Sequence, residues 1–315
     1  MDNKDIKAML FGYMIGDGWI SKGKNSKGIM VYQSGFSGDI CSLKIIKDDL
    51  IKCFGNIGKA KISSNQTFSP KYNISGTTNK FSCTQNVTKE FIKLGMPTGR
   101  RVEKEFLLPD WIVNGSYDIK KNFISGLYSA EGTTPQMQIN DRTLKPLTLC
   151  LTKRIELKEN LIEFMNQVIK IINDLGIDCS AKYVKTFTCA ENIKCTISIN
   201  NNVENIIKAI NMLDLRYCER KMEEIIILKF YYKERQAMLD KLALAYEEAM
   251  MENSSPSKIA RKYSITTRQV LKWKERRTGF RIPNTFPKYS DFAKMQRPLL
   301  STINSVKQGK NSNEN

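Results

Sequence analysis

The stretch that decides the fold is "LFGYMIGDGWI", residues 10–20. It begins as an apolar helix, yet Gly12 and Gly16 lie inside it and Asp17 ends it. A glycine costs about 1 kcal/mol relative to alanine within a helix. Because the two glycines are four residues apart, they share one helix face, on which a second helix can approach at or below the usual 8–10 Å interaxial distance. The stretch therefore predicts a closely packed helix pair with a carboxylate at its end.

A second stretch provides the partner for this helix. "ISGLYSAEG", residues 124–132, repeats the spacing with Gly126 and Ala130, and Glu131 follows directly. If the two helices pack together, both carboxylates emerge side by side, which is unfavourable unless they share a cation. Hard carboxylate oxygens suit Mg²⁺. Gly-Asp-Gly alone is equally a simple turn, but the matched pair favours a metal site.

The composition favours a polyanionic partner. The 315 residues include 50 Lys and Arg against 32 Asp and Glu, a formal charge of +18, which is typical of nucleic-acid binding. The alternative is a protein that is basic without such a partner. The absence of histidine excludes imidazole bases, Ser-His and Cys-His nucleophile pairs and zinc sites with His ligands.

The cysteines and the apolar runs indicate the compartment. The eight cysteines contain no C-x-x-C pair and lie in apolar stretches, as expected of reduced, buried thiols. The N-terminus has no signal-peptide pattern, and no apolar run is long enough to cross a bilayer. We expect a soluble, intracellular protein that does not associate with membranes.

The order of expected elements recurs along the chain, which indicates an internal duplication. Each copy reads as helix, hairpin, helix, hairpin and helix, over residues 1–115 and 116–235. In the second copy "QMQIN" and "PLTLCLT" are the expected first two strands. Residues 236–315 form a helical extension that contains a helix-turn-helix-like segment at 256–277 and ends in a polar tail, expected to be disordered.

The two motifs resemble those of the LAGLIDADG homing endonucleases of the single-chain, two-motif type. Their acids lie 114 residues apart, and "LPDWI" before the second helix resembles the junction between halves in that family. Ile15 and Ser129 depart from the pattern, because the family commonly has an acid two residues before the catalytic one. The resemblance implies an α+β fold of two pseudo-symmetric αββαββα units that form a DNA-binding saddle, with a small all-α C-terminal segment.

The resemblance also implies an activity, which is site-specific cleavage of double-stranded DNA by a monomer with an internal pseudo-two-fold axis. Asp17 and Glu131 would bind Mg²⁺, for which Mn²⁺ may substitute, and activate water for phosphodiester hydrolysis, one strand each; Gly16 and Ala130 are the adjacent metal-site candidates. The family places a basic residue near each scissile phosphate, late in each half. Arg101 and Lys221, 84 and 90 residues after the acids, fit that place, with Arg100, Lys104 and Arg220 nearby. Ordinary surface charges are the alternative.

The saddle strands would carry polar side chains toward the major groove, where Gln and Asn pair with adenine and Arg or Lys with guanine. An exposed strand face is also polar, which is the alternative. The candidates are Lys22, Lys24, Lys27, Gln33, Gln136, Gln138, Asn140, Arg142, Lys182 and Lys185.

In the C-terminal segment, "SKIARKYSITTRQVLKWKERR", apolar residues would form a small core beneath a basic second helix. Arg268 and Lys272 are the DNA-contact candidates of this helix-turn-helix-like pair, and Lys274, Arg276 and Arg277 flank them. A charged helical hairpin that packs on the main body is the alternative.

Two other functions remain open. A DNA-binding regulator without catalysis can combine a LAGLIDADG-like domain with a helix-turn-helix, although the acids are typically degraded there. An RNA maturase that assists intron splicing uses the same scaffold. Intein splicing is not expected, because the sequence has neither the N-terminal Cys or Ser block nor a terminal His-Asn pair.

Overall fold

The computed structural model describes residues 2–300, except 25, 56, 58–60, 70–73, 139–143, 188–190, 252, 276–285 and 299. The expected disordered tail, with Asn140, Arg142, Arg276 and Arg277, lies outside the described residues. The chain divides into two compact units, residues 1–136 with 144–225 and residues 137–143 with 226–315. Within the first unit, we call residues 1–115 the first lobe and residues 116–136 with 144–225 the second lobe.

The first lobe alternates helices with two antiparallel hairpins, as expected. Its elements are α1 (Asn3–Asp17), β1 (Gly18–Lys24), β2 (Met30–Gly38), α2 (Ile40–Phe54), β3 (Ser63–Ser69), β4 (Ile74–Ser82) and α3 (Gln85–Lys93). The four strands form one antiparallel sheet in the order β1-β2-β4-β3. Phe36, Phe81 and Phe91 are buried between the sheet and its helices. A short connection with η1 (Arg101–Glu103) and α4 (Asp110–Val113) leads onward.

The second lobe repeats this order with one strand fewer in the described residues. Its elements are α5 (Tyr117–Glu131), β5 (Thr148–Arg154), η2 (Ile155–Leu157), α6 (Lys158–Asp174), β6 (Cys179–Phe187), β7 (Glu191–Ile199) and α7 (Val203–Met212). The sheet order is β5-β7-β6. The strand expected over 136–140 does not form at Gln136–Gln138, where the chain makes only isolated contacts such as the Lys145 N–H to Gln136 carbonyl bond of 2.8 Å.

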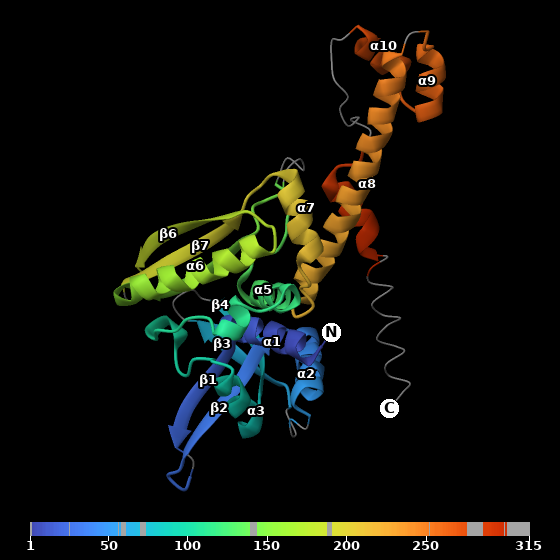
Figure 1. Cartoon of the computed structure of the whole chain (residues 1–315). Coiled ribbons are helices and arrows are strands. Elements are labelled where there is room, and N and C mark those ends of the chain that lie inside the picture. Colours follow the sequence, from blue (N-terminus) through green and yellow to red (C-terminus); the bar gives the residue numbers. More distant parts are fainter. Residues whose placement is uncertain are drawn as a thin grey trace. The chain divides into compact units, whose positions relative to one another are not determined.

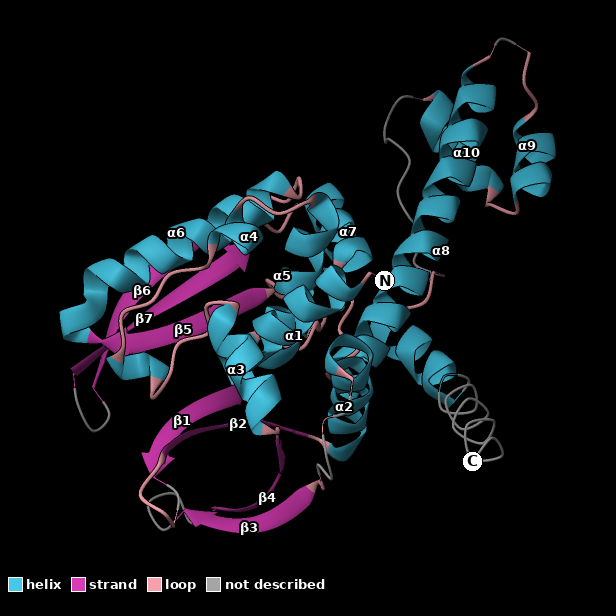
Figure 2. Ribbon diagram, turned by 60° about the horizontal axis from the view of Figure 1, so that its bottom comes forward, coloured by secondary structure: helices cyan, strands magenta, loops and turns pink. Residues whose placement is uncertain are grey.

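Helices α1 and α5 lie between the two sheets (Figures 1 and 2). Both begin at side-chain caps, because Asp2 and Asp5 form a capping box on α1 and the Ser116 hydroxyl accepts the Ile119 N–H. From Phe123 to Ser129 every residue of α5 is buried, and α1 is buried from Ala8 to Ile15. Two helices that are apolar on most sides form the centre of the unit, and their C-termini carry the two acids.

The second unit is helical. The long helix α8 (Glu219–Met250) begins in the first unit and continues into the second, which also contains α9 (Pro256–Tyr263) and α10 (Thr267–Lys274). Side chains from these three helices form a separate apolar core around Trp273. In the described part of the chain, no helix combines the length and apolar composition that crossing a bilayer requires. The α+β fold class with a helical C-terminal part agrees with the sequence analysis.

Candidate active site

The glycine-lined seam between α1 and α5 forms as the spacing predicts. A β-carbon added at Gly126 would collide with the main chain of α1, 2.8 Å from the Met9 carbonyl carbon and 3.0 Å from the Tyr13 nitrogen. A β-carbon at Gly12 would lie 2.8 Å from the Leu127 nitrogen. The two main chains are therefore in direct contact, which offsets the lost helix propensity of the glycines.

The seam brings the two acids together. A β-carbon at Gly16 would lie 2.8 Å from Cγ and 3.4 Å from Oε1 of Glu131, so this carboxylate lies directly beside the end of α1. Desolvation by the surrounding protein raises the pKa of Glu131, and the negative charge of Asp17 raises it further by a smaller amount. Desolvation also raises the pKa of Asp17, although its side chain remains exposed. Two carboxylates thus share the open end of the seam.

Arg101 caps the C-terminus of α1. Its guanidinium donates to the carbonyl oxygens of Met14 at 2.6 Å and of Gly16 and Gly18 at 2.7 Å each. Met14 and Gly16 lie in the last turn of α1 and Gly18 directly follows it, so the guanidinium lies at the negative end of the helix dipole, which a cation stabilises. Burial lowers the pKa of Arg101, while the carboxylates of Glu131 and Asp17 raise it.

Lys221 caps the C-terminus of α5 in the same way. Its ammonium donates to the carbonyl oxygens of Tyr128, Ser129 and Ala130 at 3.1, 2.7 and 3.1 Å. Burial lowers its pKa, and Asp17 and Glu131 act in the opposite direction. The interpretation of both as ordinary surface charges is therefore wrong, because the side chain of Lys221 is 8% exposed and Arg101 is half-buried. Arg100, Lys104 and Arg220 are exposed.

The donor set fits a hard divalent cation. All candidate ligand atoms are oxygens, from the carboxylates of Asp17 and Glu131 and the carbonyls of Gly16 and Ala130, each of which keeps a second lone pair beside its bond to a basic residue. Burial raises the pKa of both carboxyls, and the negative charge of Asp17 raises that of Glu131 further. Asp17 and Glu131 would hold the ion.

The two positions that depart from the LAGLIDADG pattern are both buried. Ile15 and Ser129 are 2% and 3% exposed, and the Ser129 hydroxyl donates to the Ser125 carbonyl at 2.8 Å. The hydroxyl is satisfied within its own helix, and these two positions therefore add no ligand.

The segment that carries Arg101 is anchored to the second lobe. Lys153, on the buried face of β5, donates to the Lys104 carbonyl at 2.8 Å and to the side-chain oxygen of Asn160, and its ammonium lies 4.2 Å from the Phe106 ring centroid. The Asn160 oxygen also accepts the Phe106 N–H at 3.2 Å. Burial lowers the pKa of Lys153 to about 8. This anchor holds the connection between lobes next to the seam.

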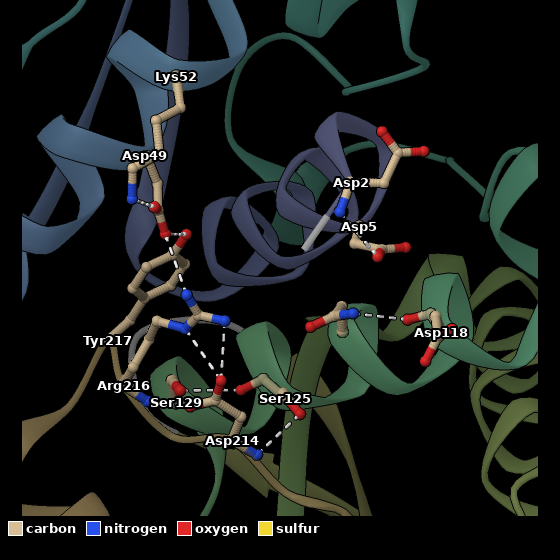
Figure 3. A network of polar contacts seen from close by, with 11 residues as sticks. Asp2, Asp5, Asp49, Lys52, Asp118, Ser125, Ser129, Asp214, Arg216 and Tyr217 are labelled. Carbon is tan, nitrogen blue, oxygen red and sulfur yellow. Dashed lines mark hydrogen bonds and ion pairs between the residues drawn. The ribbon is translucent and has the colours of Figure 1, made fainter.

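A polar network anchors the segment that carries Lys221 (Figure 3). Asp49 of α2 is buried and accepts the Tyr217 hydroxyl at 2.8 Å, and its carboxylate lies 3.7 Å from the Arg216 guanidinium. Arg216 also pairs with Asp214, whose N–H donates to the Ser125 hydroxyl in α5 at 3.1 Å. The network joins the first lobe to the chain just before α8. Neither anchor has a local sequence signal, because the partners are far apart in the sequence.

The strand register divides the candidates of the first sheet between two faces. Lys22 pairs with Tyr32 across the hairpin, and both share the face of Ser34, whose hydroxyl lies 2.7 Å from that of Thr88 in α3. Lys24 is two residues after Lys22 in the same strand, so both side chains lie on the face of the sheet that packs against the helices, at the end of the strand that the helices do not cover. Gln33 pairs with Ser21 on the open face. Lys22 and Lys24 therefore lie on a different face of the sheet from Gln33.

The open face of the second sheet is polar and includes residues that the sequence analysis missed. Lys182 lies there opposite Thr196, whereas Lys185 pairs with the buried Ile193 and has the parity of the helix-packed face. Lys194 and Thr152 are paired on the open face and line a cleft together with Gly16, Arg101 and Glu131. Alternation in β7, where Ile193, Cys195, Ile197 and Ile199 are all buried, is the signal that would have identified Lys194.

The remaining candidates lie in loops or on the C-terminal helix α10. Lys27 is exposed in the β1–β2 turn, and Gln136 and Gln138 are half-buried in the segment between α5 and β5. In the second unit, Arg268 and Lys272 are exposed on α10. The structure therefore gathers Asp17, Glu131, Arg101 and Lys221 into one site, together with the carbonyl groups of Gly16 and Ala130.

Comparisons with known proteins give distant similarities. No protein-family profile matches the chain. It is 26% identical over 297 residues to the tRNA-splicing ligase RtcB of Methanopyrus kandleri, which covers 90% of this chain but 29% of the ligase. It is 25% identical over 302 residues to the replication factor C small subunit of Methanocaldococcus jannaschii, covering 92% of this chain and 15% of that protein. The chain thus spans less than a third of the length of each.

Among solved structures, the homing endonuclease I-DmoI aligns with 67% of this chain and 97% of its own, at 17% identity and a TM-score of 0.44. That likeness is distant.

Proposed function

We propose that this chain is a site-specific, divalent-metal-dependent endonuclease of the LAGLIDADG homing type, which cuts both strands of a DNA duplex. The observation that carries the proposal is the symmetry of the seam. Each of two packed helices ends in a carboxylate, and a buried base donates to the last carbonyl groups of each helix. Two equivalent half-sites a short distance apart suit two equivalent scissile phosphates.

The protein groups have distinct roles in this proposal. Asp17 and Glu131 hold the metal and orient the attacking water. A bound divalent cation would lower the pKa of that water and stabilise the developing charge on the phosphate. Arg101 and Lys221 hold the ends of α1 and α5 and keep two positive charges beside the carboxylates, which favours the approach of a phosphate.

The surrounding surface supports a polyanionic substrate. The formal charge of +18 favours non-specific attraction to the phosphate backbone. The open faces of the two sheets carry polar side chains such as Gln33, Lys80, Lys182 and Lys194, suited to phosphates and base edges. The cleft lined by Lys194 and Glu131 connects one of these faces to the acids.

The sequence relatives support the interpretation that this chain is a self-contained module, rather than that it shares the activity of any one relative. An RNA ligase and a replication factor share no named activity, yet each matches nearly all of this chain with less than a third of its own length. The portion in common is best explained as an element carried within unrelated proteins, which is the distribution expected of a mobile endonuclease.

The test is cleavage of a library of duplex sites by the full chain with Mg²⁺. Asp17→Asn and Glu131→Gln should each abolish double-strand cleavage. Asp48→Asn and Glu163→Gln make the same chemical changes at exposed acids of α2 and α6 and should cut like the wild type. Equal activity in Glu131→Gln and Glu163→Gln would refute the proposed site.

The same experiment separates the two alternatives. A DNA-binding regulator would bind one duplex tightly, without cutting it in Mg²⁺ or Mn²⁺. An RNA maturase would restore splicing of an intron RNA, and Asp17→Asn would leave that activity intact. The meeting of the two acids at the end of the seam favours the nuclease, because DNA binding alone does not require two adjacent carboxylates.

A further inference from the structure

The helical pair α9–α10 in the second unit has the geometry of a tight helix-turn-helix. The two helices are joined by residues 264–266. Ser264 adopts a left-handed conformation with φ of 51°, and the Ile265 N–H donates to the Ala260 carbonyl at 3.0 Å. The Thr266 hydroxyl caps α10 by accepting the Gln269 N–H at 3.2 Å. The turn therefore ends α9 and begins α10 within three residues.

A small core fixes which face of α10 is presented. Val270 and Trp273 are 0% and 1% exposed, and the Trp273 ring packs edge-on against Tyr246 of α8 at 5.6 Å. The rest of the core comes from Leu242, Ala245, Ala249, Ile259 and Ala260. Because positions 270 and 273 point inward, the opposite face of α10 must point outward.

The outward face combines two bases with an apolar side chain. Thr267, Arg268 and Lys272 are exposed, and Leu271 is 45% exposed between the two basic residues. Lys274 differs, since its ammonium donates to the Ser254 carbonyl at 2.7 Å and closes the core. Leu271 is thus a largely exposed apolar side chain on a basic helix face.

The charge of the pair selects the kind of partner. Residues 254–275 contain six Lys or Arg and one acid, Glu275. Lys258 and Arg261 are exposed on α9. A helix of two turns fits the B-DNA major groove, which is about 12 Å wide, whereas the A-form RNA major groove is too deep and narrow to be read. Duplex DNA is therefore the partner that matches both shape and charge.

We propose that α10 is a recognition helix that enters a major groove and forms a DNA-reading surface separate from the two sheets. Thr267 and Arg268, in the first turn, contact base edges, and Arg268 pairs with guanine. Leu271 contacts a thymine methyl group, while Lys272, Lys258 and Arg261 contact phosphates. The inference that this surface and the two sheets bind the same target duplex rests on the proposed function. DNA reading by α10 does not depend on cleavage.

The experiment uses the full chain and a duplex selected from random sequences, with hydroxyl-radical footprinting in Ca²⁺ and cleavage in Mg²⁺ in parallel. Arg268→Ala with Lys272→Ala should remove one protected segment of the footprint and weaken binding about 10- to 100-fold, with a salt dependence lowered by about one phosphate contact, that of Lys272. Leu271→Ala should relax base preference at one position. Lys44→Ala with Lys170→Ala removes the same charge from exposed positions of α2 and α6 and should keep the whole footprint.

The outcomes distinguish the two proposals. An unchanged footprint and affinity in the Arg268→Ala, Lys272→Ala variant would overturn the recognition helix while cleavage by the wild type stands. If the variant loses a protected segment of the footprint while the wild type never cuts DNA, the result supports the recognition helix and rejects the nuclease. Binding only to structured RNA would overturn both. The exposed positions are not expected to affect folding, and an unchanged melting temperature of the variant checks this.

Discussion

Substituting alanine for Gly126 tests the seam. At an exposed helix position, Gly→Ala stabilises a protein by up to about 1 kcal/mol. At Gly126 the new methyl group would meet main-chain atoms of Met9 and Tyr13 rather than flexible side-chain ends. Main-chain atoms cannot move aside unless the two helices separate, and overpacking of this kind costs about 1–3 kcal/mol.

We therefore expect Gly126→Ala to lower the free energy of unfolding by about 1–3 kcal/mol, against the direction that helix propensity predicts. For a unit of this size the melting temperature should fall by a few degrees per kcal/mol. Separation of the helices would also move Glu131 away from Asp17, so cleavage should fall more steeply than stability.

The assay is urea unfolding followed by circular dichroism, with cleavage measured in parallel at a temperature where the variant is folded. Gly23→Ala is the matched control, since a β-carbon at Gly23 meets nothing within 4 Å, and it should be close to neutral. A Gly126→Ala protein as stable as the wild type, with full activity, would refute the reasoning about close helix contact.

Three further predictions concern the charged groups. Lys221→Met leaves the three carbonyl groups at the end of α5 without their shared donor, so the free energy of unfolding should fall by about 1–3 kcal/mol in urea melts, and an unchanged midpoint would contradict the capping role. The folded-state pKa of Glu131 is raised above its ordinary value of 4.5, so between 4.5 and the folded-state pKa the native state binds more protons than the unfolded state. The wild type therefore loses stability as the pH rises through that range. Glu131→Gln lacks this loss, so its melting temperature should rise relative to that of the wild type between pH 4 and pH 7. Burial lowers the pKa of Lys153 from 10.5 to about 8 in the folded state, so between these pH values the unfolded state binds more protons than the native state. The contribution of Lys153 to wild-type stability should therefore increase from pH 8 to 10.5. Lys153→Met should lack this increase in thermal melts across that range.

The seam was predictable from local spacing alone. Gly12, Gly16, Gly126 and Ala130 have one physical use in apolar helices, and the acids follow directly, so their meeting required only that the two copies pack together. The basic residues were predictable in position but not in environment. In "GRRVEK" Arg100 is exposed whereas Arg101 inserts at the end of α1, and adjacent identical side chains give no signal of which one turns inward.

The strand faces and the anchors were less predictable for physical reasons. Which face a residue takes in a hairpin depends on the pairing register, and pairing of Gln33 with Ser21 rather than Lys22 moves it to the other face. The anchors depend on contacts across long stretches of sequence. Asp49 meets Tyr217 168 residues later, and an aspartate within an amphipathic helix otherwise reads as exposed.

Binding of Mn²⁺ to the full chain, followed by electron paramagnetic resonance, tests most directly whether the two carboxylates share a cation. The account predicts that the wild type and Glu163→Gln bind the ion alike, and that Asp17→Asn and Glu131→Gln each lose most of that binding. Undiminished Mn²⁺ binding in both active-site variants would contradict it.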